Sequence, residues 1–399
     1  MLSDYTVAIY VLGAAGIILI GFIGNTLARR TRIPAIVWLV TFGIILGPLL
    51  GIINRNALVN ISPLASTVVL TVVLFNVGLR LDIYKSLRLM PSALRLAIIN
   101  FTFSALVVFV VMTLFGYSPA YSLLFAFILG GTSVAIIPII SEQIRMKSSA
   151  KTLVTLEATL TDPIGIVLAL AMISIILLSS YSIVTAASAI ASQFSIGIVI
   201  GAVFGLIWIP VMGMIQRKKY QFSYVASLSI VFIVYLIAQY LGGNGPLSAL
   251  TFGIMIANGE IIYRALRYRH PHYFTLDKES KSFNNLITFI VTTFFFVYLG
   301  GLITFSSTIY FVIGTIIAVG LLLVRIGGTK LSLYRNKLKR RDMFDINAMI
   351  SRGLGAAVLS TLPLEYGLLH TNAFIDVTFS VIFITIFING ILLYYNSRR

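Results

Sequence analysis

Long apolar runs separated by short polar loops dominate the chain. Most of these runs reach the length that an α-helix needs to cross a hydrocarbon core of roughly 30 Å, which is about 20 residues. The pattern therefore predicts an all-α membrane protein with about 13 transmembrane helices. The expected ranges are 5–27, 34–53, 62–79, 91–115, 119–140, 150–178, 183–216, 222–242, 246–257, 282–303, 307–325, 344–363 and 372–395.

Composition supports the membrane assignment. Of the 399 residues, 59% are hydrophobic and 10% are charged, whereas a soluble domain is about a quarter charged. The net charge of +17 would also suit nucleic acid, but the basic residues lie in short loops beside spans, where they usually face anionic lipid. We therefore expect membrane lipid rather than nucleic acid as a partner. The absence of cysteine excludes disulfides and thiolate metal sites.

The basic loops alternate along the chain. Every lysine and arginine other than Arg55, Arg95 and Arg352 falls in a loop or tail on one face of the predicted helices. The positive-inside rule makes that face cytoplasmic and places the N-terminus outside the cell membrane and the C-terminus inside. The groups on this face lie within 29–32, 80–88, 145–151, 217–219, 264–281, 325–341 and 398–399.

The thirteen spans divide into six, one and six. The first and eighth spans run in opposite directions, so the two halves would be inverted repeats at about 5–178 and 222–395, joined by a linker helix at about 183–216. Together they would form one transmembrane domain over 1–399. Inverted repeats are a common plan among transporters, which bind their substrates near the midplane where helices are broken.

Glycines mark the fifth span of each half. The first half has Gly130-Gly131-Thr132-Ser133, and the second has Arg352-Gly353-Leu354-Gly355. Taken singly, either segment would be explained by close helix packing at small residues. Their corresponding positions instead predict two discontinuous helices, broken at Gly130 and Gly131 and at Gly353 and Gly355, that cross at the midplane.

Two of the twelve acidic residues, Glu157 and Asp162, are expected away from loops and helix ends. A helix that enters the membrane near Ala150 would place Glu157 roughly 10 Å deep and Asp162 roughly 18 Å deep, near the midplane. An ionisable group there costs several kcal/mol unless it is paired, hydrated or protonated, and it is usually functional. The alternative is a protonated Asp162 that hydrogen-bonds across helices in a structural role.

Glu157 and Asp162 lie about 140° apart around the helix, so we expect no carboxylate dyad. Arg352 is the better partner for Glu157. A helix that enters from the cytoplasm near Phe344 would place Arg352 roughly 12 Å deep, close to the level of Glu157. Because a guanidinium suits one carboxylate, we predict a structural Glu157–Arg352 ion pair, which leaves Asp162 as the titratable group.

Oxygen-bearing residues accompany Asp162. Thr161 precedes it, Thr132 and Ser133 lie in the expected break of the fifth span, and Pro163 frees a backbone carbonyl because it has no N–H. Hard cations prefer oxygen ligands, and a proton competes with a cation for a buried carboxylate. The sequence therefore predicts that Asp162, Thr161, Thr132 and Ser133 bind either a monovalent cation or a proton, which would give exchange.

Several motifs resemble the monovalent cation/proton antiporter superfamily, most closely its prokaryotic sodium/proton antiporters related to animal exchangers. The sixth-helix motif of that family is similar to Leu156-Glu157-Ala158-Thr159-Leu160-Thr161-Asp162-Pro163, and its twelfth-helix motif to Arg352-Gly353-Leu354-Gly355. The resemblance implies a homodimer, a mobile core bundle, Asp162 as the ion-binding acid and a Glu157–Arg352 pair. Further similar segments are Leu27-Ala28-Arg29-Arg30, Ile33-Pro34, Gly43-Ile44-Ile45-Leu46-Gly47-Pro48 and Phe75-Asn76-Val77-Gly78-Leu79-Arg80-Leu81-Asp82.

Two departures from the family pattern concern the ion. Sodium-transporting members usually have Thr-Asp where this chain has Thr132-Ser133, and the change resembles the potassium-efflux branch, so sodium and potassium both stay candidates. Thr161 stands where the family has Asn or a second Asp, which favours an electroneutral one-for-one exchange. The expected function is exchange of sodium or potassium for protons, by alternating access around Asp162.

Other classes of function fit less well. A sodium-coupled organic-anion symporter can have a similar helical plan, but it needs cationic groups for its anion and Arg352 is the only candidate. An intramembrane aspartyl protease needs two acids that share a proton, whereas Glu157 and Asp162 lie on different faces of one helix. We expect no enzymatic activity and no cofactor. His270 and His272 are interpreted as solvated loop residues rather than as pH sensors.

Overall fold

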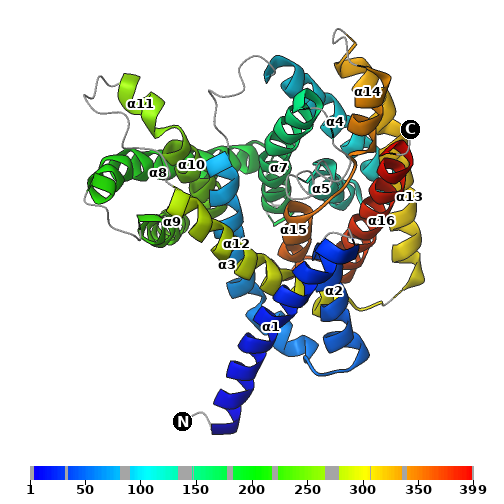
Figure 1. Ribbon diagram of the computed structural model, residues 1–399, viewed down its shortest axis with the longest axis horizontal. Helices are drawn as coiled ribbons and strands as arrows, with labels where there is room; N and C mark the ends of the chain where they lie inside the picture. Colours follow the sequence, from blue (N-terminus) through cyan, green and yellow to red (C-terminus); the bar gives the residue numbers. More distant parts are fainter. Residues whose placement is uncertain are drawn as a thin grey trace. The chain divides into compact units, whose positions relative to one another are not determined.

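The computed structural model describes residues 4–31, 35–80, 90–133, 146, 148–177, 183–217, 223–265, 278–305, 307–334 and 339–397. Within these ranges the chain is helical and has no β-strand (Figure 1). The prediction of an all-helical membrane protein is confirmed. The helices of the first part are α1 (Asp4–Thr31), α2 (Ala35–Ile44), the π-helix Ile45–Leu49, α3 (Arg55–Arg80), α4 (Met90–Leu114), α5 (Pro119–Gly130) and α7 (Ser148–Leu177).

The second part of the chain begins with a 35-residue helix, α8 (Ile183–Arg217), where the sequence predicts a linker helix. The predicted segment 344–363 consists of two helices, α14 and α15, with non-helical backbone between them. The remaining helices are α9 (Ser223–Tyr240), α10 (Gly245–Ala257), α11 (Gly259–Ala265), α12 (Lys278–Leu302), α13 (Thr308–Ser332), α14 (Arg340–Ala348), α15 (Leu354–Glu365) and α16 (Thr371–Ser397).

Seven of the described helices are long and apolar enough to cross a membrane, judged by length and composition. Six shorter apolar helices accompany them, and each of the thirteen predicted segments overlaps one of these apolar helices. The number of crossings and the two repeats stay predictions. The long apolar stretches are Arg55–Leu79, Met90–Leu114, Ala150–Leu177, Ala191–Met214, Ser282–Leu302, Thr308–Ser332 and Thr371–Leu392.

Two predicted boundaries differ from the structure by about two turns. Helix α3 begins at Arg55 rather than at 62, and Pro63 lies inside it, which membrane helices tolerate because other groups satisfy the freed backbone. Helix α13 continues to Ser332 rather than ending at 325. Arg325, predicted to lie in a cytoplasmic loop, is therefore inside a helix and only 3% exposed.

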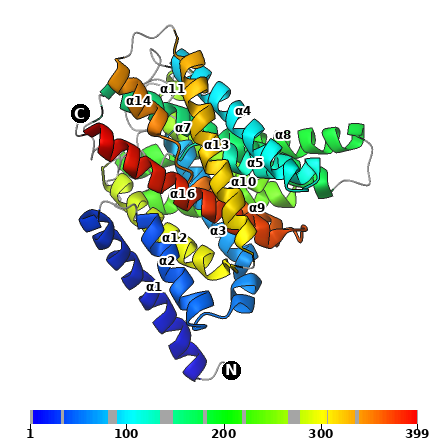
Figure 2. The same ribbon diagram turned by 90° about the vertical axis from the view of Figure 1, so that its right-hand side faces the viewer.

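The chain forms two compact units. Unit 1 comprises Met1–Ser66, Thr132–Val154 and Phe289–Arg399, and unit 2 comprises Thr67–Gly131 and Thr155–Thr288. In unit 1, α13 packs along α16 (Figure 2). In unit 2, α8, α9 and α10 pack against one another.

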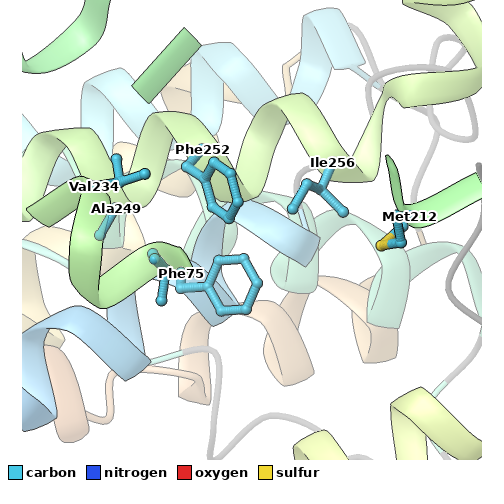
Figure 3. Packing of buried hydrophobic residues seen from close by; sticks show 7 residues of the cluster. Phe75, Met212, Val234, Ala249, Phe252 and Ile256 are labelled. Atoms are coloured by element: carbon cyan, nitrogen blue, oxygen red, sulfur yellow. The ribbon is translucent and has the colours of Figure 1, made fainter. Parts of the chain in front are cut away.

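The core of unit 2 joins α3 and α10 to α8 and α9. The Phe75 and Phe252 rings lie 5.8 Å apart at their centroids, and Ala249 and Ile256 continue the packing along α10 (Figure 3). On α8, Gly197, Gly201 and Gly205 are spaced four residues apart, and a Cβ on any of them would press against α10 or against Asn244, the residue that precedes it. Small residues at this spacing let membrane helices approach closely.

Each unit also contains one crossing where two glycine backbones touch. In unit 1, a Cβ on Gly43 of α2 would come within 2.9 Å of the Gly300 Cα atom of α12. In unit 2, a Cβ on Gly78 of α3 would come within 2.9 Å of the Gly253 Cα atom of α10. The first crossing joins predicted spans 2 and 10, and the second joins predicted spans 9 and 3. In the two predicted halves, span 2 corresponds to span 9 and span 10 to span 3, so each crossing is the counterpart of the other.

Candidate ion-binding site

Helix α7 carries both acids that the sequence predicts inside the membrane, Glu157 for an ion pair and Asp162 for the ion-binding site. Glu157 is fully enclosed, and Asp162, one and a half turns later, is partly buried. Pro163 lies inside the helix, and because it has no N–H, the carbonyl of Thr159 loses the partner that the helical ladder would provide. This part of α7 therefore offers two oxygen-bearing groups, the Asp162 carboxylate and the Thr159 backbone carbonyl.

Asn100 of α4 is the neighbour of Glu157 within unit 2. Its Nδ2 atom donates a hydrogen bond to the Glu157 Oε1 atom at 3.4 Å. The Asn100 Oδ1 atom is buried and has no hydrogen-bond partner among the described residues. Sequence reasoning missed this residue, although an asparagine in the middle of a predicted apolar span was the signal that could have found it.

The end of α5 lies against α7. Helix α5 ends at Gly130, and Gly131 continues in an extended conformation with φ −80° and ψ 155°. A Cβ on Gly131 would come within 3.2 Å of the Thr161 carbonyl oxygen, so the glycine lets the backbone pass directly over the residue before Asp162. Thr132 and Ser133 follow as buried, non-helical residues. The remainder of the predicted span 119–140 lies outside the described residues.

The break in the twelfth span covers residues 349–353, between α14 and α15. Gly353 is the last residue of the break, whereas Gly355 lies in the first turn of α15. Within unit 1, the residues after Gly131 are joined directly to this break, because the Ser133 N–H donates a hydrogen bond to the Ser351 carbonyl oxygen at 3.0 Å. The non-helical residues after α5 therefore meet the break before α15, whereas the discontinuity of the fifth span and the correspondence of the two spans stay predictions.

Side chains of α16 satisfy the broken backbone. The Asn389 Oδ1 atom accepts from the Ile350 N–H at 3.2 Å, and Asn389 also donates to the Ser351 hydroxyl. The Thr385 hydroxyl accepts from the Arg352 N–H at 3.3 Å. Irregular backbone inside a membrane protein requires such partners, because lipid cannot supply them.

Arg352 is 2% exposed. Its Nη1 atom donates to the Ile350 carbonyl oxygen at 2.7 Å, so the guanidinium folds back over the break. Arg352, Thr132 and Ser133 belong to unit 1, whereas Glu157, Thr161 and Asp162 belong to unit 2. The Glu157–Arg352 ion pair and the shared cation site of Asp162, Thr161, Thr132 and Ser133 therefore stay predictions. His270 and His272 lie outside the described residues.

Burial of acidic side chains is not confined to Glu157 and Asp162. Asp342 and Asp345 of α14 and Asp376 of α16 are each no more than 5% exposed. The Asp376 carboxylate accepts from the Thr304 N–H at 3.2 Å and from its hydroxyl at 2.9 Å. Arg325 is a further buried charge, and its Nε and Nη2 atoms both donate to the Ile346 carbonyl oxygen at 3.3 Å.

Solved structures with a similar fold include two of the sodium proton antiporter MjNhaP1 from Methanocaldococcus jannaschii. One, at pH 8, has a TM-score of 0.81 and 20% identity, and covers 98% of this chain and 100% of that chain. The other, a 3D EM map, has a TM-score of 0.71 and 22% identity, over 96% of this chain and 95% of that chain. No curated protein matches the sequence.

The family comparison covers nearly the whole chain. The model of the family described as "Sodium/hydrogen exchanger, transmembrane" matches residues 16–394, which include α7, both breaks and all of the candidate site residues. This is a family of transporters and not of enzymes. The chain belongs to the sodium/hydrogen exchanger family.

Proposed function

We propose that the protein exchanges a monovalent cation, sodium or potassium, for protons across the cell membrane. The observation that carries this proposal is the position of Asp162, one residue after Thr161, whose carbonyl lies under the extended Gly131. A carboxylate beside interrupted helical backbone supplies the oxygen ligands that a hard cation needs. Membership of the sodium/hydrogen exchanger family supports the same function, as does the likeness to MjNhaP1, a sodium proton antiporter.

Asp162 is the group for which the two substrates compete. The carboxylate binds either one proton or one cation, and a carrier that crosses only with the site filled exchanges one for the other. Thr161, Thr132 and Ser133 supply hydroxyl or carbonyl oxygens to the cation in this proposal. Pro163 adds the Thr159 carbonyl, which has no helical N–H to accept.

Glu157 and Arg352 have a structural role in the proposed mechanism. Both are buried, and leaving either charge without an opposite charge would cost several kcal/mol. Their pairing would tie α7 to the break before α15 without taking up the transported proton. With Glu157 committed, a single free carboxylate remains, and one-for-one exchange follows.

The proposed exchanger is a homodimer in lipid, with its N-terminus outside the cell and its C-terminus in the cytoplasm. The topology rests on the basic loops. The dimer rests on the family resemblance. Neither property is needed for the chemistry at Asp162.

Exchange in proteoliposomes tests the function. Purified protein is reconstituted with an imposed pH gradient, and sodium, lithium or potassium is added separately while the internal pH is followed. Collapse of the gradient by sodium or potassium is expected for the wild-type protein and for the control variant Glu260→Gln, which removes an acid from α11. Failure of every cation to collapse the gradient would refute the proposal.

A further inference from the structure

A cluster of buried oxygen atoms in unit 1 includes none of the residues assigned to the Asp162 site. Its members are the Ser62 and Ser66 hydroxyls of α3, the Tyr298 hydroxyl of α12 and the Oε2 atom of Glu365 on α15. All four atoms are enclosed, and none forms a hydrogen bond with another described residue. Ser62, Ser66 and Tyr298 are each no more than 2% exposed. Buried polar atoms without partners are rare and call for an explanation such as a bound water or ion.

The four atoms converge on one place. Ser62 and Ser66 lie four residues apart, on the same face of α3. The Ser66 hydroxyl lies near the Glu365 carboxylate, the Ser62 hydroxyl lies near the Tyr298 hydroxyl, and Glu365 and Tyr298 are close enough to interact electrostatically. These pairs approach one another but fall short of hydrogen-bond geometry, so the oxygens gather without satisfying one another.

The end of α15 fixes Glu365 in the cluster. Glu365 is the last residue of the helix, and Gly367 follows in the left-handed conformation with φ +64°. The Leu368 N–H donates to the Pro363 carbonyl at 2.8 Å and the Gly367 N–H to the Leu364 carbonyl at 3.3 Å. These two bonds form a Schellman motif, in which a glycine closes the helix without steric cost. The carboxylate is therefore held at a defined helix terminus.

A carboxylate in this position needs a positive charge. The C-terminus of a helix carries the negative end of the helix dipole, which disfavours an anion there. Among the described residues no lysine or arginine forms an ion pair with Glu365. Tyr298 and Tyr366 interact electrostatically with Glu365. Both are acids themselves, so neither brings a positive charge. No basic side chain in the described part of the chain therefore neutralises the carboxylate.

We infer that Glu365, Ser66, Ser62 and Tyr298 form a second binding site for a monovalent cation, separate from Asp162. One carboxylate and three neutral oxygens match the charge of an alkali ion. Calcium takes six to eight oxygens, often with several carboxylates, and magnesium needs near-ideal octahedral geometry, so neither divalent ion fits as well. The site does not depend on the proposed exchange at Asp162.

Direct binding of radiolabelled sodium to the purified full-length protein tests the site. Measurements at alkaline pH, in a buffer without other alkali ions, compare Asp162→Asn with Asp162→Asn/Glu365→Gln. We expect Asp162→Asn to retain about one sodium ion per chain and the double variant to bind at least tenfold more weakly. Adding Ser66→Ala or Tyr298→Phe to Asp162→Asn removes one hydroxyl and is expected to weaken binding by about two- to tenfold.

Controls separate this inference from the proposed function. The variant Asp162→Asn/Glu260→Gln loses one carboxylate that lies outside the cluster, in place of Glu365. It is expected to bind sodium as tightly as Asp162→Asn does. Size-exclusion profiles and unfolding temperatures show whether each variant is folded, and the single-hydroxyl variants decide the question if Glu365→Gln does not fold. An Asp162→Asn protein without bound sodium, or one whose binding is unaffected by Glu365→Gln, Ser66→Ala and Tyr298→Phe, would overturn the second site. Loss of exchange in Asp162→Asn with sodium still bound supports the second site and the proposed function separately.

Discussion

Ser133 donates its backbone N–H to the carbonyl oxygen of Ser351 at 3.0 Å, a bond between two segments more than two hundred residues apart in the chain. Ser351 lies in the break between α14 and α15, and Ser133 lies in the non-helical segment that follows α5. The bond gives each interruption a partner that water would otherwise supply. It also couples the segment that contains Thr132 to the segment that contains Arg352.

Asp162→Asn is expected to abolish exchange, because it removes the charge that attracts the cation and keeps the size of the side chain. The measurement is the collapse of an imposed pH gradient on addition of cation to proteoliposomes. Circular dichroism and size exclusion should match the wild-type protein, because Asp162 is only partly buried. Near wild-type rates in Asp162→Asn would remove Asp162 from the centre of the mechanism.

Glu157 and Arg352 are expected to be coupled in stability. Breaking a buried pair costs about 3–5 kcal/mol, since the remaining charge stays unpaired. A double-mutant cycle with Glu157→Gln and Arg352→Gln, read by thermal unfolding, should therefore be strongly non-additive. The cycle of Glu157→Gln with Arg325→Gln is the matched comparison, because Arg325 is the other arginine that is buried among the described residues. Additivity with Arg352 and coupling with Arg325 would reassign the partner of Glu157.

Exchange is expected to be electroneutral. With one free carboxylate, the carrier holds either one proton or one monovalent cation, so its charge is the same in both directions. Moving an unbalanced charge would cost about 2.3 kcal/mol per 100 mV. Rates in liposomes whose potential is set with a proton-independent ionophore should not change with voltage. A current on solid-supported membranes that reverses with the cation gradient would show that a second proton moves.

Gly131→Ala is expected to lower cation affinity while the protein stays folded. The added Cβ would meet the Thr161 carbonyl at 3.2 Å and displace the backbone next to Asp162. The apparent cation affinity in exchange, measured at fixed pH, should fall several-fold. Gly327→Ala in α13 is the matched control, because its Cβ meets nothing within 4 Å and alanine favours a helix by about 1 kcal/mol over glycine. Equal affinities in the two variants would separate Gly131 from the site.

Asn389→Leu is expected to destabilise the break before α15. It leaves the Ile350 N–H without its side-chain acceptor, and a buried unsatisfied donor costs about 1–3 kcal/mol. The unfolding temperature should fall, and exchange should fall with it. Thr315→Val is the control, since the Thr315 hydroxyl bonds only to the Phe311 carbonyl of its own helix. An unchanged unfolding temperature in Asn389→Leu would show that the break does not depend on α16.

Helix positions could be predicted from the sequence because spans need long apolar runs, and lipid enforces that requirement at every residue. The start of α3 was missed because the polar residues between Arg55 and Ser62 look like a loop when judged by hydropathy alone. The end of α5 at Gly130 and the break that ends at Gly353 coincide with glycines that the sequence singled out, whereas the two halves to which they were assigned stay predictions. Gly355 shows the limit of that argument, since it lies within α15.

Burial of charge was harder to predict than helix position. Arg325 follows an apolar run and precedes a basic loop, so charge counting assigns it to the loop, although α13 continues for seven more residues. Asp342 and Asp345 sit among basic residues and are nevertheless enclosed. Only three-dimensional packing decides which face of α14 meets the protein. The same holds for Asn100, whose role depends on the neighbour that α7 brings to it.

The glycine crossings at Gly43–Gly300 and Gly78–Gly253 have a consequence for random mutagenesis of this protein. Any side chain at these four positions meets backbone, which cannot be moved aside by a change of rotamer. Inactive clones should therefore fall into two groups that differ in abundance. Substitutions at the crossings should prevent folding and so lower the amount of protein in the membrane. Substitutions at Asp162 should abolish transport but leave that amount unchanged. Measuring expression beside transport would sort the two causes of inactivity without a further structure.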